Sequence, residues 1–172
     1  MTWKYDGRKH PWFADKVEPG QESVWDFPRP PAVVRDSRRV RVCFDGIDIA
    51  DSTNSVRVLE TASAPGVYIP PADIDMSLLQ ESADRTFCEW KGEAAYMDLL
   101  VRERVLRRVA WTYHAPTAHF AEIAGFVSFY PAHVECYVDD ERVMPQDGGF
   151  YGGWVTAELA GPIKGAHGTG WW

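Results

Sequence analysis

The chain has 172 residues, of which 45% are hydrophobic and 13% aromatic, and this size and composition suit one domain with a sizeable core. Its formal net charge is −7 and its isoelectric point is about 5.2. Because this mean charge repels a phosphate backbone, we do not expect the protein to bind nucleic acid without sequence preference.

No apolar run is long enough to cross a bilayer, and residues 1–10 lack the apolar stretch of a secretory signal. The cysteines, Cys43, Cys88 and Cys136, are odd in number and far apart. This pattern favours reduced thiols over a disulfide framework. We therefore predict a cytoplasmic protein that does not associate with membranes.

Residues 1–31 are predicted to form an extended N-terminal arm. Five prolines interrupt regular helix and central strand in this stretch. The arm also carries large rings that a disordered tail would lack. We therefore expect it to pack on the domain, with Trp25 and Phe27 as anchors.

Residues 32–147 are predicted to form the core domain. Alternating apolar residues favour strands at 40–44 and 47–50, and the Asp45-Gly46 pair between them favours a type I′ hairpin turn. Further short strands are expected at 56–60 and 67–69.

The second half of this domain is also dominated by strand patterns. A short helix is predicted at 73–79 and one or two helical turns at 118–124. Strands are predicted at 85–90, 94–100, 105–113, 126–130, 134–138 and 141–143. Asp139-Asp140 is expected to form a tight turn. Residues 148–172, rich in glycine and aromatic rings, are predicted to form a C-terminal arm. Many short strands with turns between them predict an all-β fold.

The sequence offers little support for a metal site or a nucleophilic catalyst. It has no Cys-x-x-Cys pair, no His-Glu-x-x-His, no calcium-loop spacing, no Gly-x-Ser-x-Gly and no phosphate loop. Cys88 precedes Lys91 by three residues, and an ammonium group would favour the thiolate. On a regular strand, however, these side chains point to opposite faces. We therefore interpret Cys88 as a buried, inert thiol.

Charged residues on strands that otherwise resemble core strands are the remaining candidates for a site. Arg57 and Glu60 flank one apolar pair, and Glu89 and Lys91 flank Trp90. One interpretation is that they form ion pairs on a solvated sheet face. The other is an aromatic-lined site in which Arg57 and Lys91 hold an anion and Glu60 accepts a proton. Arg57 and Glu60 do not alternate onto one face, so such a site would need a bulge or would use only one of them.

Several motifs in order resemble domain-of-unknown-function family 427, over about residues 22–161. They are Arg-Val-Leu-Glu-Thr at 57–61, Tyr-Ile-Pro-Pro at 68–71, Cys-Glu-Trp-Lys-Gly-Glu-Ala-Ala-Tyr at 88–96, Ala-Trp-Thr-Tyr at 110–113 and Val-Ser-Phe-Tyr at 127–130. Glu89 stands where the family motif usually has proline. The tail from Gly148 is similar to that of the longer, actinobacterial-type members.

The resemblance implies a β-tent fold, in which two antiparallel sheets meet at an angle. Many relatives of that fold hold a structural zinc through two Cys-x-x-Cys pairs, which this sequence lacks, so zinc is not expected. The family label suggests a nucleotidyltransferase, although neither a paired-aspartate metal motif nor a phosphate loop is present.

Our first hypothesis is a small-molecule site for a planar or anionic ligand, with no cofactor named. Its catalytic candidates are Glu60 as general base and Lys91 as electrostatic stabiliser. Its ligand-binding candidates are Arg57, Tyr68, Trp90, Tyr96, Trp111, Tyr113 and Tyr130. The alternatives are a protein-interaction module that uses aromatic arms or a sheet edge, with a homodimer among its forms, and a nucleotidyltransferase-like enzyme.

Overall fold

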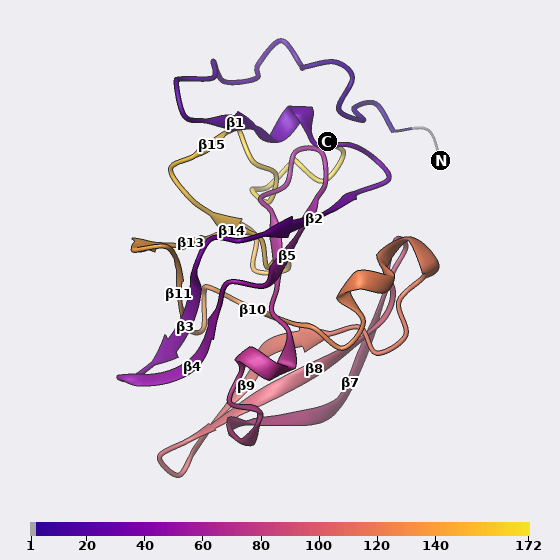
Figure 1. Cartoon of the computed structure of the whole chain (residues 1–172). Helices are drawn as coiled ribbons and strands as arrows, with labels where there is room; N and C mark the ends of the chain where they lie inside the picture. The colour runs from indigo at the N-terminus through magenta and orange to yellow at the C-terminus, as the bar shows by residue number, and fades with distance from the viewer. Residues whose placement is uncertain (1–2) are drawn as a thin grey trace.

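Short strands make up most of the fold in the computed structural model, which describes residues 3–172 (Figure 1). The strands are β1 (Glu22–Ser23), β2 (Ala32–Asp36), β3 (Val40–Phe44), β4 (Ile47–Ser52), β5 (Ser55–Leu59), β6 (Gly66–Tyr68), β7 (Leu79–Cys88), β8 (Gly92–Val101), β9 (Arg104–Thr112), β10 (Val127–Phe129), β11 (Glu135–Val138), β12 (Glu141–Arg142), β13 (Met144–Pro145), β14 (Trp154–Val155) and β15 (Leu159–Ala160). Four short 3₁₀ helices join them: η1 (Val24–Asp26), η2 (Pro71–Asp73), η3 (Met76–Leu78) and η4 (Ala118–Ile123). The all-β class is confirmed. None of the helices within residues 3–172 has the length and apolar character needed to span a membrane.

Two four-stranded antiparallel sheets enclose the main core. One has the order β10-β9-β8-β7 and the other β12-β11-β3-β4. The Asp45-Gly46 turn joins β3 to β4 as predicted, and both residues have positive φ, at 49° and 75°. Apolar side chains of both sheets, including Val42, Leu99 and Phe129, are fully buried between them.

A three-stranded sheet, β2-β5-β6, continues the first sheet because Ile69 bridges to Val127 at the start of β10. A second apolar cluster lies where β5 and β6 face the ends of β8 and β9. It joins Val56 and Val58 to the rings of Tyr96 and Trp111. This aromatic cluster forms the base of the candidate site.

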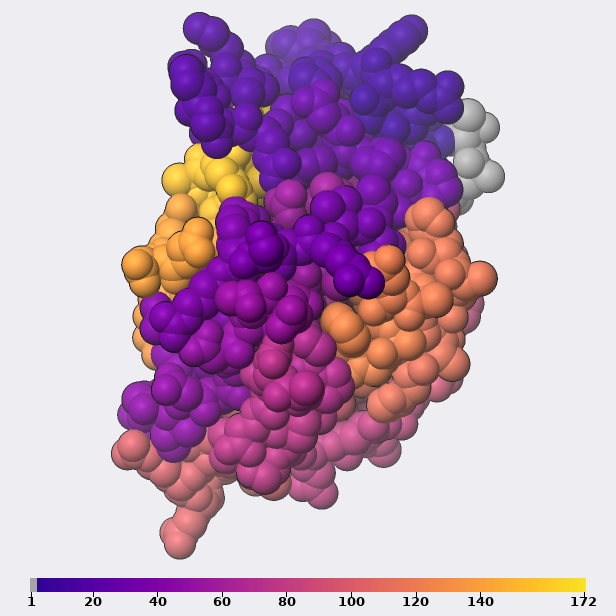
Figure 2. Space-filling view, in the orientation of Figure 1, coloured from indigo at the N-terminus to yellow at the C-terminus, as the bar shows by residue number. Residues whose placement is uncertain are grey.

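The two ends of the chain pack together on one side of the domain. Strand β1 pairs in parallel with β15, and the Trp25 indole donates a hydrogen bond to the Gly161 carbonyl. Trp25 and Phe27 are buried, as predicted for anchors. The space-filling view shows the N-terminal segment covering one end of the molecule beside the C-terminal segment (Figure 2).

In the middle of the chain one predicted element was wrong and another has different bounds. The helix predicted at 73–79 is replaced by η2 and η3, because Ile74 between them pairs with Ala50 of β4 and cannot continue a helix. The strand predicted at 85–90 begins earlier, at Leu79, and ends at Cys88. Residues 89–91 therefore form the turn between β7 and β8, which changes the direction of Lys91.

Candidate functional site

A cavity of about 480 Å³ opens beside the aromatic cluster, between the β7–β8 turn, the end of β5 and the C-terminal segment. Eight of the nine residues predicted from the sequence line it: Glu60, Tyr68, Trp90, Lys91, Tyr96, Trp111, Tyr113 and Tyr130. A smaller recess of about 110 Å³ adjoins it and shares Glu60, Tyr68, Lys91 and Trp111. The fold thus brings together side chains that are up to 70 positions apart in the sequence.

The aromatic wall of the cavity is held by its own polar contacts. The Trp111 indole Nε1 donates a hydrogen bond to Tyr68 Oη at 3.2 Å, and its ring lies 4.5 Å from that of Tyr130. Tyr96 Oη is 2.7 Å from Thr86 Oγ1, and the Arg108 guanidinium lies 3.9 Å above the Tyr96 ring. These rings therefore have fixed positions from which they can stack on a planar ligand.

The phenol groups in this wall resist ionisation. Burial, with further contributions from neighbouring acidic groups, raises the pKa of Tyr113 and of Tyr130 above the usual tyrosine range. Burial also raises the pKa of Tyr68. At neutral pH these hydroxyls are therefore neutral hydrogen-bonding groups.

Lys91 provides a stable positive charge at the cavity. Its Nζ lies 5.7 Å from the ring centres of both Tyr113 and Phe120. Burial opposes its charge, but the acidic groups Tyr68, Cys88 and Glu60 around it outweigh that effect and raise its pKa. Lys91 therefore remains an ammonium group under physiological conditions.

Glu60 is held at the cavity by a buried arginine that sequence reasoning missed. Arg29 Nε donates to Glu60 Oε1 at 3.1 Å, and the Arg29 side chain is only 1% exposed. Oε2 of Glu60 makes no hydrogen bond with the residues that the structure describes. One carboxylate oxygen thus fixes the position of Glu60 while the other is free to accept a hydrogen bond or a proton.

Cys88 also lines the cavity, and its predicted separation from Lys91 was wrong. Because β7 ends at Cys88 and Lys91 lies in the following turn, the strand alternation that would separate them does not apply. The Cys88 thiol is partly exposed, and its interactions with Lys91 and Tyr113 affect the pKa of both. It is therefore not the buried thiol that the sequence suggested.

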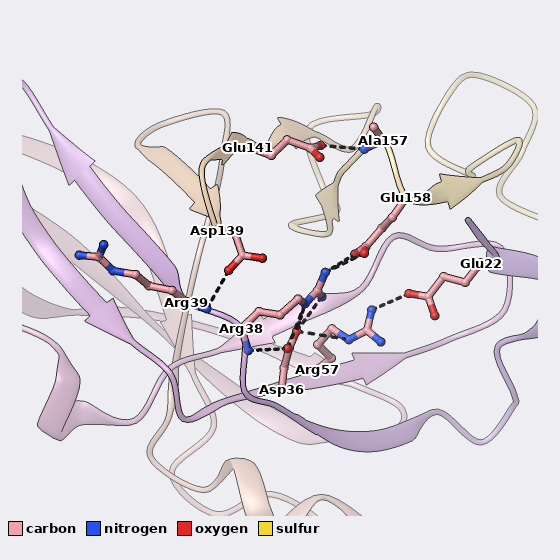
Figure 3. A network of polar contacts seen from close by, with 9 residues as sticks. All are labelled: Glu22, Asp36, Arg38, Arg39, Arg57, Asp139, Glu141, Ala157 and Glu158. Carbon is pink, nitrogen blue, oxygen red and sulfur yellow. Dashed lines mark hydrogen bonds and ion pairs between the residues drawn. The ribbon is translucent and has the colours of Figure 1, made fainter. Parts of the chain in front are cut away.

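Arg57 lies away from this cavity, in an ion-pair network on the other face of β5 (Figure 3). Its Nη1 is 2.6 Å from Glu22 Oε1, and its Nε is 3.7 Å from Asp36 Oδ2. Arg38 links Asp36 to Glu158 through contacts of 2.7 Å to each carboxylate. The structure therefore separates Arg57 from Glu60 and Lys91, in line with the alternation of the strand, and Arg57 attaches the N-terminal arm to the domain while Arg38 attaches the C-terminal segment through Glu158.

Residues from the arms complete the cavity, and most of them were not expected from the sequence. Trp3 lies 6.4 Å from Trp90, and the C-terminal segment contributes Tyr151, Gly152 and Lys164. The glycines around Tyr151 were a usable signal, because a Cβ at Gly152 would overlap the Trp111 ring. Nothing in the local pattern marks Lys164.

The sequence profile of the family described as domain of unknown function (DUF427) matches residues 32–140. The chain belongs to this family. No curated protein was found to match it. The eight predicted cavity residues lie inside the matched region, whereas Trp3, Tyr151 and Lys164 lie outside it. Within residues 3–172, His, Cys, Asp and Glu side chains form no group of three or more that could hold a metal ion.

Proposed function

We propose that the cavity binds a planar, anionic small molecule. The observation that carries this proposal is the meeting of Lys91 with the rings of Trp90, Tyr96, Trp111 and Tyr130 around one cavity of about 480 Å³. A volume of this order accommodates a small ligand, and a mainly aromatic lining with few charged groups is typical of ligand sites.

Charge favours an anion over a cation in this cavity. Lys91 and Lys164 both line it, and the carboxylate of Glu60 is already paired with Arg29. Glu89, the other acid in the lining, is exposed to solvent, where its charge is screened. A carboxylate or phosphate on the ligand would therefore find two ammonium groups, while its ring would stack on the indoles and phenols.

The same arrangement supports roles for Glu60 and Lys91 in a reaction of the bound ligand. Glu60 is assigned as the proton acceptor because it is oriented by Arg29 and keeps Oε2 free of other contacts with the described residues. Lys91 is assigned as the stabiliser of negative charge that develops on the ligand. Nucleotidyl transfer is a separate hypothesis, tested by including nucleoside triphosphates with Mg²⁺ among the ligands.

A thermal-shift and calorimetry panel tests the binding proposal. It pairs aromatic carboxylates and phosphates with neutral amides of the same shape. An anionic ligand at about 100 times its Kd should stabilise the protein by about 2.7 kcal/mol. The variant K91M should bind the anions at least about tenfold more weakly, since it removes one charged contact.

Lys16 provides the matched control, because its side chain is 87% exposed on the N-terminal segment. K16M should leave all affinities unchanged. The proposal fails if no anion stabilises the wild type, or if K91M binds the anions as tightly as the wild type and K16M do.

Exposed rings favour a second candidate, a protein-interaction surface. Trp12 is 94% exposed and Phe150 is 75% exposed. Light scattering on the wild type and on W12A tests this alternative. A concentration-dependent dimer that W12A dissociates would support it, whereas a monomer at all concentrations would argue against self-association through Trp12.

A further inference from the structure

Lys164 is an unusual lysine because most of its residue is buried while its ammonium, which keeps some exposure, has no ion-pair partner among residues 3–172. Its residue is 7% exposed, yet it lines the cavity. Within residues 3–172, no carboxylate oxygen lies within 4.0 Å of its ammonium, and that group makes no hydrogen bond. Its Nζ lies 5.1 Å from the centre of the Tyr151 ring. Lysines are rarely so buried without an ion-pair partner, which makes Lys164 a candidate for contact with a ligand in the cavity.

Two hydrogen bonds hold the backbone of Lys164 at the edge of the cavity. Its amide donates to the Ala62 carbonyl at 2.8 Å, and its carbonyl accepts from the Gln146 side chain at 2.8 Å. Gln146 is itself 4% exposed. Lys164 is therefore positioned by a buried network, as expected of a residue that acts on a ligand.

The two lysines at the cavity have pKa values that are shifted in opposite directions. Burial lowers the pKa of Lys164, and repulsion from Arg29 and Lys91 adds to this, although Glu60 and Glu89 act in the opposite direction. The pKa of Lys91 is raised instead. When two like groups are shifted in opposite directions in one site, they suit opposite roles. Lys91 suits holding an anion, whereas Lys164 gives up its proton more readily than Lys91 and so suits acting as an amine.

We propose that Lys164 is a nucleophilic amine that condenses with an aldehyde or ketone group of the planar, anionic ligand to form an imine. A partly desolvated lysine beside another cation is a recognised arrangement for this chemistry. This inference rests on the proposed function of the cavity, and it names the substrate class as an aromatic or conjugated carbonyl compound that carries a carboxylate or phosphate.

The step balances with groups that line the cavity. Because no carboxylate of residues 3–172 lies within 4.0 Å of Nζ, solvent water carries a proton from the Lys164 ammonium to Glu60, and the free Nζ attacks the carbonyl carbon to form a C–N bond. The carbonyl oxygen takes up the proton that the attacking nitrogen releases and becomes the hydroxyl of a carbinolamine. The proton held by Glu60 then returns to this hydroxyl through the same water, so that the C–O bond breaks, water leaves and the protonated imine remains. The net change converts a carbonyl group and an ammonium group to an iminium group and water, with no oxidant or reductant.

Reductive trapping tests this proposal on the wild-type protein. The probe is 4-formylbenzoate, added with sodium cyanoborohydride, which delivers hydride to the imine carbon and leaves a stable secondary amine. The lysines of the chain are Lys4, Lys9, Lys16, Lys91 and Lys164, so peptide mapping by mass spectrometry locates the adduct directly. We expect Lys164 to be labelled about tenfold faster than exposed Lys16.

The variants K164R and K164M should lose this adduct, while K16M should keep it. The non-carbonyl analogue 4-(hydroxymethyl)benzoate distinguishes ligand binding in the cavity from imine formation at Lys164, because it can bind but cannot form an imine. Binding of the analogue without trapping at Lys164 would overturn this inference alone. Absence of both binding and trapping would overturn the inference together with the proposed function. A predominant adduct on Lys91 would reverse the assigned roles and refute the proposal, and the wild-type map decides this even if K164M does not fold.

Discussion

Arg29 is predicted to contribute more to stability than any exposed arginine, because it joins both arms to the candidate site. Its side chain is 1% exposed, and its guanidinium donates hydrogen bonds to Glu60 Oε1 at 3.1 Å and to the backbone oxygens of Tyr5, Thr61 and Trp172 at 3.0, 3.2 and 2.9 Å. Replacing Arg29 by alanine leaves three backbone acceptors and one carboxylate without their donor.

The expected loss in R29A follows from these contacts. Removing one partner of a buried ion pair typically costs about 3–5 kcal/mol. Glu60 is 20% exposed and can regain some hydration, so we expect the lower end of this range, about 3 kcal/mol. For a chain of this length, such a loss corresponds to a decrease in Tm of roughly 6–12 °C.

Urea unfolding followed by tryptophan fluorescence, together with calorimetry, measures this loss. R29K keeps the charge but lacks the planar fork, so its stability should fall between those of R29A and the wild type. R8A is the control, because Arg8 is 84% exposed in its pair with Asp6 and should contribute less than about 0.5 kcal/mol. A loss below about 1 kcal/mol in R29A would refute the reasoning that this buried fork holds the arms in place.

Three further predictions concern the cavity wall and the ion-pair network. In G152A the new Cβ would overlap the Trp111 ring, so we expect the free energy of unfolding measured in urea to fall by about 1–3 kcal/mol. An unchanged free energy would contradict the close approach of Gly152 to Trp111. In Y68F the Trp111 indole loses its acceptor, so thermal unfolding should show a loss of about 1–2 kcal/mol, and no loss would mean that this hydrogen bond is unimportant. Burial of Asp36 opposes its ionisation, but hydrogen bonds from Arg38 outweigh this and lower its pKa. Because the folded pKa is lower than the unfolded one, Asp36 stabilises the fold above about pH 4 and this contribution is lost as the pH falls through the folded value. D36N should therefore be less stable than the wild type at neutral pH and lose less stability on acidification; parallel pH profiles would disprove the assignment.

Local sequence patterns determined the strand content and most of the candidate residues. The Asp45-Gly46 turn and the alternation on either side of it depend on neighbouring residues only, and the structure has this hairpin. The aromatic and charged residues of the sequence motifs could also be recognised from the sequence, and eight of them line one cavity. Motif order identified residues that meet in space, although it could not state which side chains point inward.

Tertiary structure alone decided which charges meet at the cavity. Ile74 pairs with β4 and prevents the predicted helix, and β7 ends at Cys88, so that Lys91 turns into the cavity with the thiol. Arg57 is directed to the opposite face, where Glu22 and Asp36 hold it. Lys164 enters from a segment more than 70 positions away from Lys91. Strand alternation already allowed Arg57 and Glu60 to lie on different faces, but burial and long-range pairing depend on the whole fold, so no local pattern could have predicted that Lys164 is the second cation of the cavity.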